Sequence, residues 1–150
     1  SDRAVAEVVE RSDAEVRQLE GLPQRNEVLR GALAGPVPIR EDGIAYRVDV
    51  MAGQKTGFYL DQRASRHRVR RLARGRSVLN AFCYTGGFTL AALAGGARDT
   101  VSIDSSADAL ALARSNLAAN PALASKGASS SESSDGSWFW KAWIDGASVP

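Results

Sequence analysis

The sequence predicts an α/β fold in which a β-hairpin precedes part of a parallel sheet. An apolar run at residues 77–82 passes through the adjacent glycines Gly86 and Gly87 into an alanine- and leucine-rich helix. A second strand-like run, 100–104, ends on an acid and is followed by another helical segment that Ser105 or Ser106 would cap. Strands that alternate with helices at this spacing are typical of parallel sheets.

The composition is that of a soluble globular protein. The chain has 150 residues, enough for one domain with a core, and a formal net charge of +2. One cysteine, Cys83, excludes an intramolecular disulfide, and no apolar run is long enough for a signal peptide or a membrane span. His67 has no neighbouring histidine or cysteine with which to bind a metal. We therefore expect a cytoplasmic protein without a metal or a membrane partner, and the oligomeric state stays open.

The chain before the glycines divides into a lead-in and a hairpin region. Residues 1–36 mix apolar and charged positions, which predicts a helix followed by polar coil, with a solvated face and no chemistry. Apolar and polar residues then alternate on both sides of Asp42 and Gly43, and this dipeptide between two such runs is a strong hairpin signal. The hairpin and the short strand-like run that follows it account for residues 37–62.

Residues 63–76 contain a run of arginines without any acid. Val69, Leu72 and Ala73 form a narrow apolar stripe, so a helix docked by this stripe would direct its arginines outward. Such a surface fits RNA phosphates, whose attraction is independent of base sequence, although a solvated basic helix explains the charge equally well. The candidate RNA contacts are Arg63, Arg66, Arg68, Arg70, Arg71 and Arg74.

The glycine turn and the acid after the next strand together suggest a bound nucleotide. Gly86 and Gly87 let a ligand approach the backbone, and Asp104, about 20 residues further on, is placed to accept hydrogen bonds from ribose hydroxyls. The loop lacks the full G-x-G-x-x-G that closes around a pyrophosphate, which favours S-adenosylmethionine over NAD. A nicotinamide-dependent oxidoreductase and a purely structural glycine turn remain as alternatives.

The last part of the chain, residues 121–150, has a different character. Residues 128–137 are a serine-rich, low-complexity segment, which predicts disorder. All three tryptophans follow within residues 138–143, with no clean period. We expect this tail to be disordered.

Three segments of the sequence carry a family resemblance. They read GQKTGFYLDQR at 53–63, VLNAFCYTGGF at 78–88 and VSIDSS at 101–106. In combination they closely resemble the class I S-adenosylmethionine-dependent methyltransferases that modify cytosine C5 in large-subunit ribosomal RNA. The resemblance extends from about residue 9 to about residue 120 and implies that residues 63–120 form the first half of a Rossmann-like domain.

The resemblance implies S-adenosylmethionine as the cofactor and assigns residues to its site. Asp104 would hold the ribose, Ser105 would lie beside the adenosine, and residues 55–63 would pack across the pocket. The implied cofactor contacts are Phe58, Asp61, Gln62, Tyr84, Thr85, Gly86, Gly87, Phe88, Asp104 and Ser105.

The sequence also departs from this family. Its members continue with a third strand, an Asp-Pro-Pro motif and a later cysteine that attacks cytosine C6, and they carry an N-terminal PUA-type domain; none of these is found in the 150 residues. We assign no catalytic residue, and we expect Cys83, which lies in the cofactor loop, to be a packing residue. The expected function is that of a fragment that holds the cofactor-binding half of the enzyme and is inactive alone. The alternative is a non-catalytic RNA-binding module that uses residues 63–76.

Overall fold

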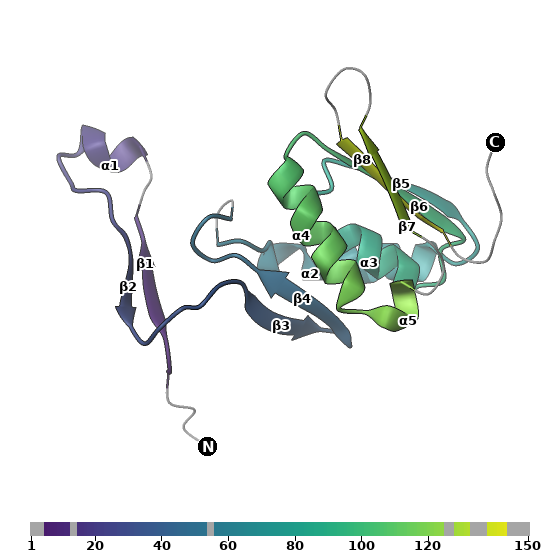
Figure 1. The fold of residues 1–150 in the computed structure, drawn as a ribbon, viewed down its shortest axis with the longest axis horizontal. Helices are drawn as coiled ribbons and strands as arrows, with labels where there is room; N and C mark the ends of the chain where they lie inside the picture. Colours follow the sequence, from purple (N-terminus) through teal and green to yellow (C-terminus); the bar gives the residue numbers. More distant parts are fainter. Residues whose placement is uncertain (1–4, 13–14, 54–55, 125–127, 133–137, 144–150) are drawn as a thin grey trace. The chain divides into compact units, whose positions relative to one another are not determined.

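The computed structural model describes residues 5–12, 15–53, 56–124, 128–132 and 138–143 (Figure 1). The chain divides into two units, one made of residues 1–37 and 48–58 and the other of residues 38–47 and 59–150. Expectations about Lys55, about both ends of the chain and about the serine-rich residues 133–137 fall outside the described residues. Within the described ranges, no helix has both the length and the apolar character needed to cross a bilayer.

The first unit contains a β-ribbon. Strand β1 (Val8–Arg11) pairs antiparallel with β2 (Asn26–Arg30), and the short helix α1 (Glu15–Leu19) lies between them in sequence. The expectation of a helix followed by coil in the lead-in is therefore wrong at both strands, because pairing between distant segments leaves no local periodicity to read.

The same unit contains residues 48–58. The Arg11 guanidinium donates a hydrogen bond to the carbonyl oxygen of Val50 at 3.4 Å and another to that of Gly53. Gly57 has φ +79°, and a Cβ atom at this position would lie 2.1 Å from the carbonyl oxygen of Asp49. Only glycine fits this close backbone contact.

The predicted hairpin is confirmed. Strands β3 (Val37–Glu41) and β4 (Ile44–Val48) form a two-stranded sheet, and Asp42 and Gly43 between them have φ angles of 50° and 86°. Positive φ at both central residues is the signature of the type I′ turn that the Asp-Gly dipeptide predicts.

The second unit contains the predicted strand and helix alternation. After a 3₁₀ turn, η1 (Leu60–Gln62), the elements are helix α2 (Arg63–Leu72), strand β5 (Ser77–Ala81), helix α3 (Gly87–Ala94), strand β6 (Asp99–Asp104), helix α4 (Ala107–Ala118) and the short helix α5 (Pro121–Ala124). Strands β5 and β6 pair parallel, with Ser77 opposite Asp99 and Ala81 opposite Ile103. The fold is therefore α/β and partially Rossmann-like, as predicted.

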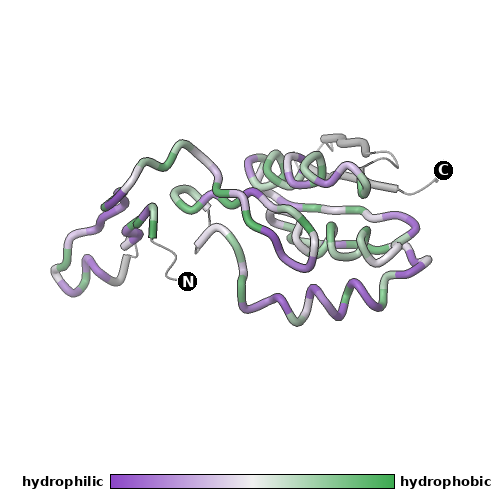
Figure 2. Tube along the Cα trace, turned by 90° about the horizontal axis from the view of Figure 1, so that it is seen from below, coloured by the Kyte–Doolittle hydropathy of each residue, from purple (hydrophilic) through white to green (hydrophobic). Residues whose placement is uncertain are grey.

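The helices α2, α3 and α4 cover one face of strands β5 and β6 (Figures 1 and 2). Val78 on this face packs against buried alanines of α3 and of the segments that flank α2 and α3. The packing is close, because a Cβ atom at Gly95 would lie 1.9 Å from the carbonyl oxygen of Arg70. The opposite face of the sheet carries Leu79 and Ile103, which are 66% and 36% exposed. Within the described residues, strands β5 and β6 thus have one face covered by helices and one face with exposed apolar side chains.

The interface between α3 and the sheet is partly polar. Thr89 and Ser102 are fully buried, and their hydroxyl oxygens lie 2.7 Å apart. The Asn80 amide donates to the Thr89 hydroxyl at 2.9 Å. Small hydrogen-bonded side chains in these positions let the helix approach the strands closely.

Two strands occur in the tail where the sequence predicted disorder. Strand β8 (Trp138–Trp143) pairs antiparallel with β6, and β7 (Ala128–Glu132) pairs with β8, which gives the order β5-β6-β8-β7. Aromatic residues favour strands, and the second edge of β6 offers main-chain groups to pair with. The prediction of disorder is thus wrong for residues 128–132 and 138–143. It is also wrong for the short helix α5.

Candidate cofactor site and basic helix

The loop between β5 and α3 has an unusual backbone. Phe82, Tyr84 and Gly86 have φ angles of 57°, 50° and 79°. Left-handed backbone at non-glycine residues costs roughly 1–2 kcal/mol per residue, and such conformations concentrate at ligand-binding loops. Space at Gly86 is also tight, because a Cβ atom there would lie 3.1 Å from the Cβ of Ala113 on α4.

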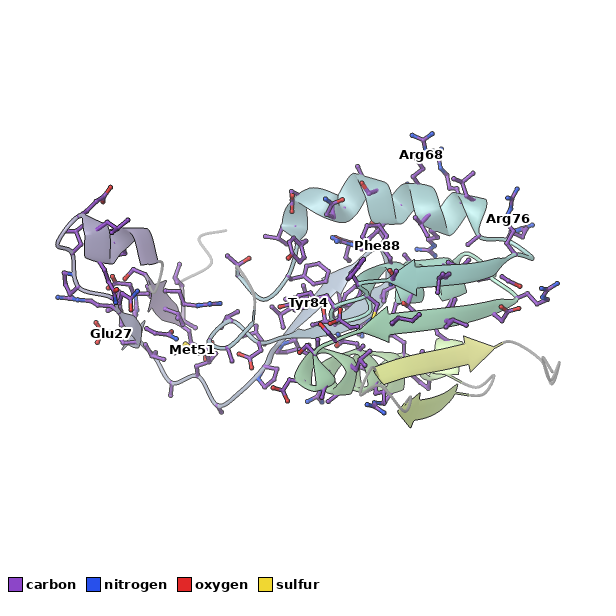
Figure 3. All side chains as sticks on the ribbon, turned by 90° about the horizontal axis from the view of Figure 1, so that it is seen from above. Glu27, Met51, Arg68, Arg76, Tyr84 and Phe88 are labelled. Atoms are coloured by element: carbon purple, nitrogen blue, oxygen red, sulfur yellow. The ribbon has the colours of Figure 1, made fainter. Side chains whose placement is uncertain are left out.

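Asp104, at the end of β6, is hydrogen-bonded to this loop. Its Oδ2 accepts a hydrogen bond from the main-chain N–H of Tyr84 at 2.7 Å, and its Oδ1 accepts one from the N–H of Ser106 at 3.0 Å. A carboxylate offers about four acceptor positions, so this partly exposed side chain keeps capacity for further donors. The structure thus brings together the glycine loop and the acid that the sequence predicted as partners. Figure 3 shows Tyr84 of this loop at the carboxyl ends of β5 and β6.

An aromatic pair lies beside the loop. The rings of Tyr59 and Tyr84 make an edge-to-face contact with a centroid distance of 5.6 Å. Tyr59 directly precedes η1, which contains the predicted contacts Asp61 and Gln62, so the predicted strand-like wall is in fact a turn of 3₁₀ helix. Phe58, the third residue predicted here, is buried within the first unit.

The remaining predicted cofactor residues occupy the loop and the ends of the two strands. Thr85 and Gly86 are buried, Gly87 and Phe88 begin α3, and Ser105 is exposed after β6. Ser106, and not Ser105, caps α4, because its hydroxyl accepts a hydrogen bond from the N–H of Ala109 at 3.2 Å.

Asn116 of α4 is hydrogen-bonded to the loop, a role that the sequence did not lead us to predict. It is fully buried; its Nδ2 donates to the carbonyl oxygen of Thr85 at 3.0 Å, and its Oδ1 accepts from the N–H of Arg47 at 2.6 Å. One turn later, Asn120 exchanges two hydrogen bonds with the main chain of Ala45 at 2.9 and 2.8 Å. Two asparagines four residues apart, one in the last turn of an otherwise largely apolar helix and one just beyond its end, are the signal that predicts such a role.

Phe82 was also missed. It opens the loop with its side chain 90% exposed. An exposed aromatic residue with left-handed backbone directly after β5 is a candidate ligand contact, because such strained backbone concentrates at ligand-binding loops. Its position at the end of the apolar run, four residues before Gly86, is the sequence signal.

The environment of Cys83 is that of a packing residue. The side chain is buried, and burial together with the negative charge of Asp104 raises the pKa of the thiol to about 12. The sulfur lies 3.6 Å from the carbonyl oxygen of Tyr84. A thiol in this state is protonated at neutral pH and is a poor nucleophile.

The geometry of the loop fits S-adenosylmethionine. The free acceptor positions of Asp104 suit ribose hydroxyls, and the first N–H groups of α3, which have no partner within the helix, suit a carboxylate. The loop contains no third glycine to close around phosphates. In the parts of the chain that are described, no cluster of His, Cys, Asp or Glu side chains could hold a metal ion.

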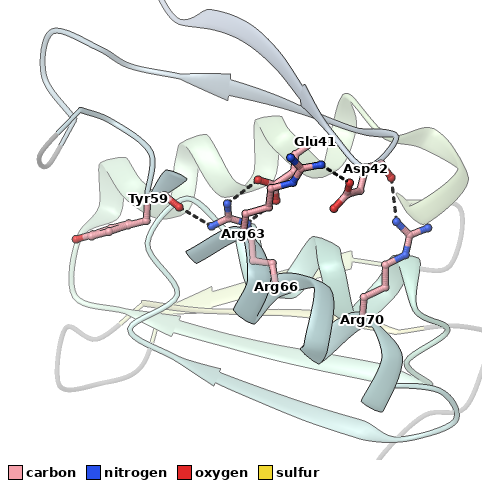
Figure 4. Close-up of polar contacts among 6 residues, drawn as sticks. All are labelled: Glu41, Asp42, Tyr59, Arg63, Arg66 and Arg70. Atoms are coloured by element: carbon pink, nitrogen blue, oxygen red, sulfur yellow. Dashed lines mark hydrogen bonds and ion pairs between the residues drawn. The ribbon is translucent and has the colours of Figure 1, made fainter. Parts of the chain in front are cut away.

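The arginines of α2 do not all lie on an exposed face. Arg66 is 4% exposed and forms a bidentate ion pair with Glu41, with N–O distances of 2.6 and 2.7 Å. Its third hydrogen bond is to the carbonyl oxygen of Tyr59 at 2.8 Å (Figure 4). The expectation that Arg66 faces outward as an RNA contact is therefore wrong, because a buried carboxylate partner offsets the cost of burying its charge. The other candidates are exposed or partly exposed; they are Arg63, Arg68, Arg70, Arg71 and Arg74.

Comparison with known proteins shows a family. Residues 21–140 match the family described as S-adenosylmethionine-dependent methyltransferase. The chain is 54% identical over 114 residues to the ribosomal RNA large subunit methyltransferase I of Photobacterium profundum, and 50% identical over 114 residues to that of Shewanella denitrificans. Each alignment covers 75% of this chain and 29% of the relative, so the chain spans less than a third of the length of these relatives.

A solved structure agrees with these relatives. The crystal structure of SMU.776 in complex with SAH matches with a TM-score of 0.59 and 38% sequence identity, over 63% of this chain and 26% of that one. The matches decide between the two cofactors that the loop alone left open, in favour of S-adenosylmethionine.

Proposed function

The chain belongs to the S-adenosylmethionine-dependent methyltransferase family, and on that basis we propose that it is the cofactor-binding part of an enzyme that methylates cytosine C5 in large-subunit ribosomal RNA. Support for ribosomal RNA as the substrate comes from the names of the two relatives. We expect an enzyme that acts on this RNA to be cytoplasmic. The C5 position rests on the resemblance of the three sequence segments.

The hydrogen bond between Asp104 and the N–H of Tyr84 is the single observation that carries the cofactor assignment. It fixes the carboxylate and the loop relative to one another, so that the ribose acceptor and the N-terminus of α3 face the same ligand. In the proposed site Asp104 binds the ribose and Ser105 lies beside the adenosine. The other proposed contacts within the second unit are Asp61, Gln62, Tyr84, Thr85, Gly86, Gly87 and Phe88.

We further propose that this chain binds the cofactor without transferring its methyl group. Methylation at C5 needs a thiolate that adds to C6 and a base that later removes the C5 proton. Cys83 is the only thiol of the chain, and its burial and raised pKa argue against this role. When bound, the cofactor supplies an electrophilic methyl group; the residues present position it.

Calorimetric titration of the chain with S-adenosylhomocysteine tests the cofactor proposal, with NAD as the control ligand. We expect binding of the former alone, and binding of NAD alone would contradict the assignment. Transfer of labelled methyl to deproteinised large-subunit RNA tests the second part, for which we expect no turnover. Turnover that disappears in Cys83→Ser would overturn the proposed inactivity and identify Cys83 as the nucleophile.

One observation favours a second function, a non-catalytic RNA-binding module. Arg68, Arg71 and Arg74 are exposed on a segment without acids. RNA binding without any binding of S-adenosylmethionine or S-adenosylhomocysteine in the same titration would favour this alternative.

A further inference from the structure

The arginines of α2 fall into two sets on two sides of the helix. Arg63, Arg66 and Arg70 are spaced i, i+3, i+7, which places them on one side. Arg68 and Arg71 are three residues apart on another side, and Arg74 is an exposed arginine in the segment just beyond the helix end.

The first set holds the hairpin turn. Arg66 is paired with Glu41, Arg63 donates to the Asp42 carboxylate at 2.9 Å, and Arg70 donates to the Asp42 carbonyl oxygen at 2.9 Å (Figure 4). The hydrogen bond from Arg63 lowers the pKa of Asp42, so the carboxylate stays charged. These three guanidinium groups have protein partners and are not available as a group for phosphates.

The second set has a different environment. Arg68, Arg71 and Arg74 are exposed, and Figure 3 shows Arg68 directed away from the sheet. No acid occurs within residues 63–76 to neutralise them, and none of the basic residues there is a lysine. Guanidinium groups bind phosphates in a planar, bidentate geometry that an ammonium group does not offer. Side chains three residues apart on a helix have Cβ atoms about 5–6 Å apart, which suits neighbouring phosphates of one strand.

We propose that Arg68, Arg71 and Arg74 form the RNA-binding surface of this chain, whereas Arg63, Arg66 and Arg70 position the hairpin and do not contact RNA. This division rests on the proposed function, because it takes RNA as the partner. The surface binds phosphates and has no base specificity. It therefore holds the RNA, and other contacts select the nucleotide. RNA is the partner that we favour for this basic surface, because its phosphates suit the planar, bidentate hydrogen bonding of guanidinium groups.

The test is the salt dependence of binding to fluorescein-labelled polyuridylic acid. We compare the full chain with the triple variant Arg68→Gln, Arg71→Gln, Arg74→Gln. A matched variant, Arg30→Gln, Arg40→Gln, Arg47→Gln, removes the same charge from exposed positions elsewhere. A third variant, Arg63→Gln, removes one arginine of the hairpin set. Thermal unfolding of each variant establishes that it is folded.

The plot of log K against log salt concentration has a negative slope, and the first triple variant should make it less steep by about 2, since each phosphate contact to a single strand contributes about 0.7. The matched triple variant and Arg63→Gln should change it by less than half as much. Equal slopes in the first triple variant and the parent chain would overturn the division, as would a loss confined to Arg63→Gln. If the parent chain binds no polyuridylic acid, RNA as the partner is itself refuted, and binding to phosphatidylglycerol vesicles in the same assay would assign the surface to lipid.

Discussion

Arg66 and Glu41, which are 25 residues apart in the sequence, form a two-pronged ion pair in which the side chains are only 4% and 11% exposed. The pair fastens α2 to the turn of the hairpin, and the guanidinium group also bonds the main chain of Tyr59. One side chain thus connects the basic helix, the hairpin and the aromatic pair beside the cofactor loop.

Arg66→Met should lower the free energy of unfolding by about 3–5 kcal/mol, because it leaves the Glu41 carboxylate buried without a partner. Urea denaturation measures this. Arg68→Met, on the exposed side of the same helix, should change it by no more than about 0.5 kcal/mol. The double variant Arg66→Met, Glu41→Leu should recover most of the loss; a double variant as unstable as the single one would contradict the assignment.

Asp104→Ala should weaken binding of S-adenosylhomocysteine by about 1.5–3 kcal/mol, the range for hydrogen bonds to a charged group. Calorimetry on the folded variant measures it. Ser106→Ala is the matched control, because it removes the cap of α4 and should cost about 1 kcal/mol of stability without a change in affinity. Equal affinities in Asp104→Ala and the parent chain would remove Asp104 from the site.

Asn116→Leu and Asn120→Leu separate support of the loop from support of the hairpin. Each should lower stability, by about 1–3 kcal/mol for every buried partner left unsatisfied. Only Asn116 bonds the carbonyl oxygen of Thr85, so only its replacement should also lower cofactor affinity. The two variants are compared by denaturation and by calorimetry. Similar affinities in both would show that Asn116 does not position the loop.

Cys83 should resist alkylation by iodoacetamide at neutral pH and react only as the pH approaches its raised pKa of about 12. Because the folded state holds this proton more tightly than the unfolded state, stability is unaffected below the ordinary thiol pKa and falls as the pH rises from there towards about 12. In Asp104→Asn the onset of alkylation should move to lower pH. Rapid alkylation of the folded parent at pH 7 would show that the thiol is accessible and ionised.

Gly95→Ala should destabilise the protein by about 1–3 kcal/mol through overpacking, since its Cβ would lie 1.9 Å from the carbonyl oxygen of Arg70. Gly75→Ala is a useful comparison, because that position has φ +67° and open space around it. It should cost only the left-handed backbone, roughly 1–2 kcal/mol. Thermal unfolding ranks the two, and a smaller effect at Gly95 would argue against close packing of α2 on α3.

The sequence predicted those parts of the fold that local patterns determine. The Asp42-Gly43 turn, the two parallel strands and the serine cap of α4 follow from short-range rules, and the structure confirms them. The pairing of the glycine loop with Asp104 followed from the order of strand, turn and strand.

The errors concern contacts between residues distant in the sequence. The burial of Arg66 depends on Glu41, and the roles of Asn116 and Asn120 depend on strand β4 about 70 residues earlier. The strands of the lead-in and the tail likewise form by pairing with strands elsewhere in the chain. The residue pattern within each segment does not reveal this pairing.

The half-covered sheet has a consequence for how this protein behaves in solution. Leu79 and Ile103 expose apolar surface to water. Burying this surface against a second apolar surface is favourable by about 25 cal/mol per Å². If two chains pack against each other through this face, each chain shields the apolar surface of the other from water. Self-association should therefore increase with protein concentration and weaken on cooling, since burial of apolar surface loses its driving force at low temperature.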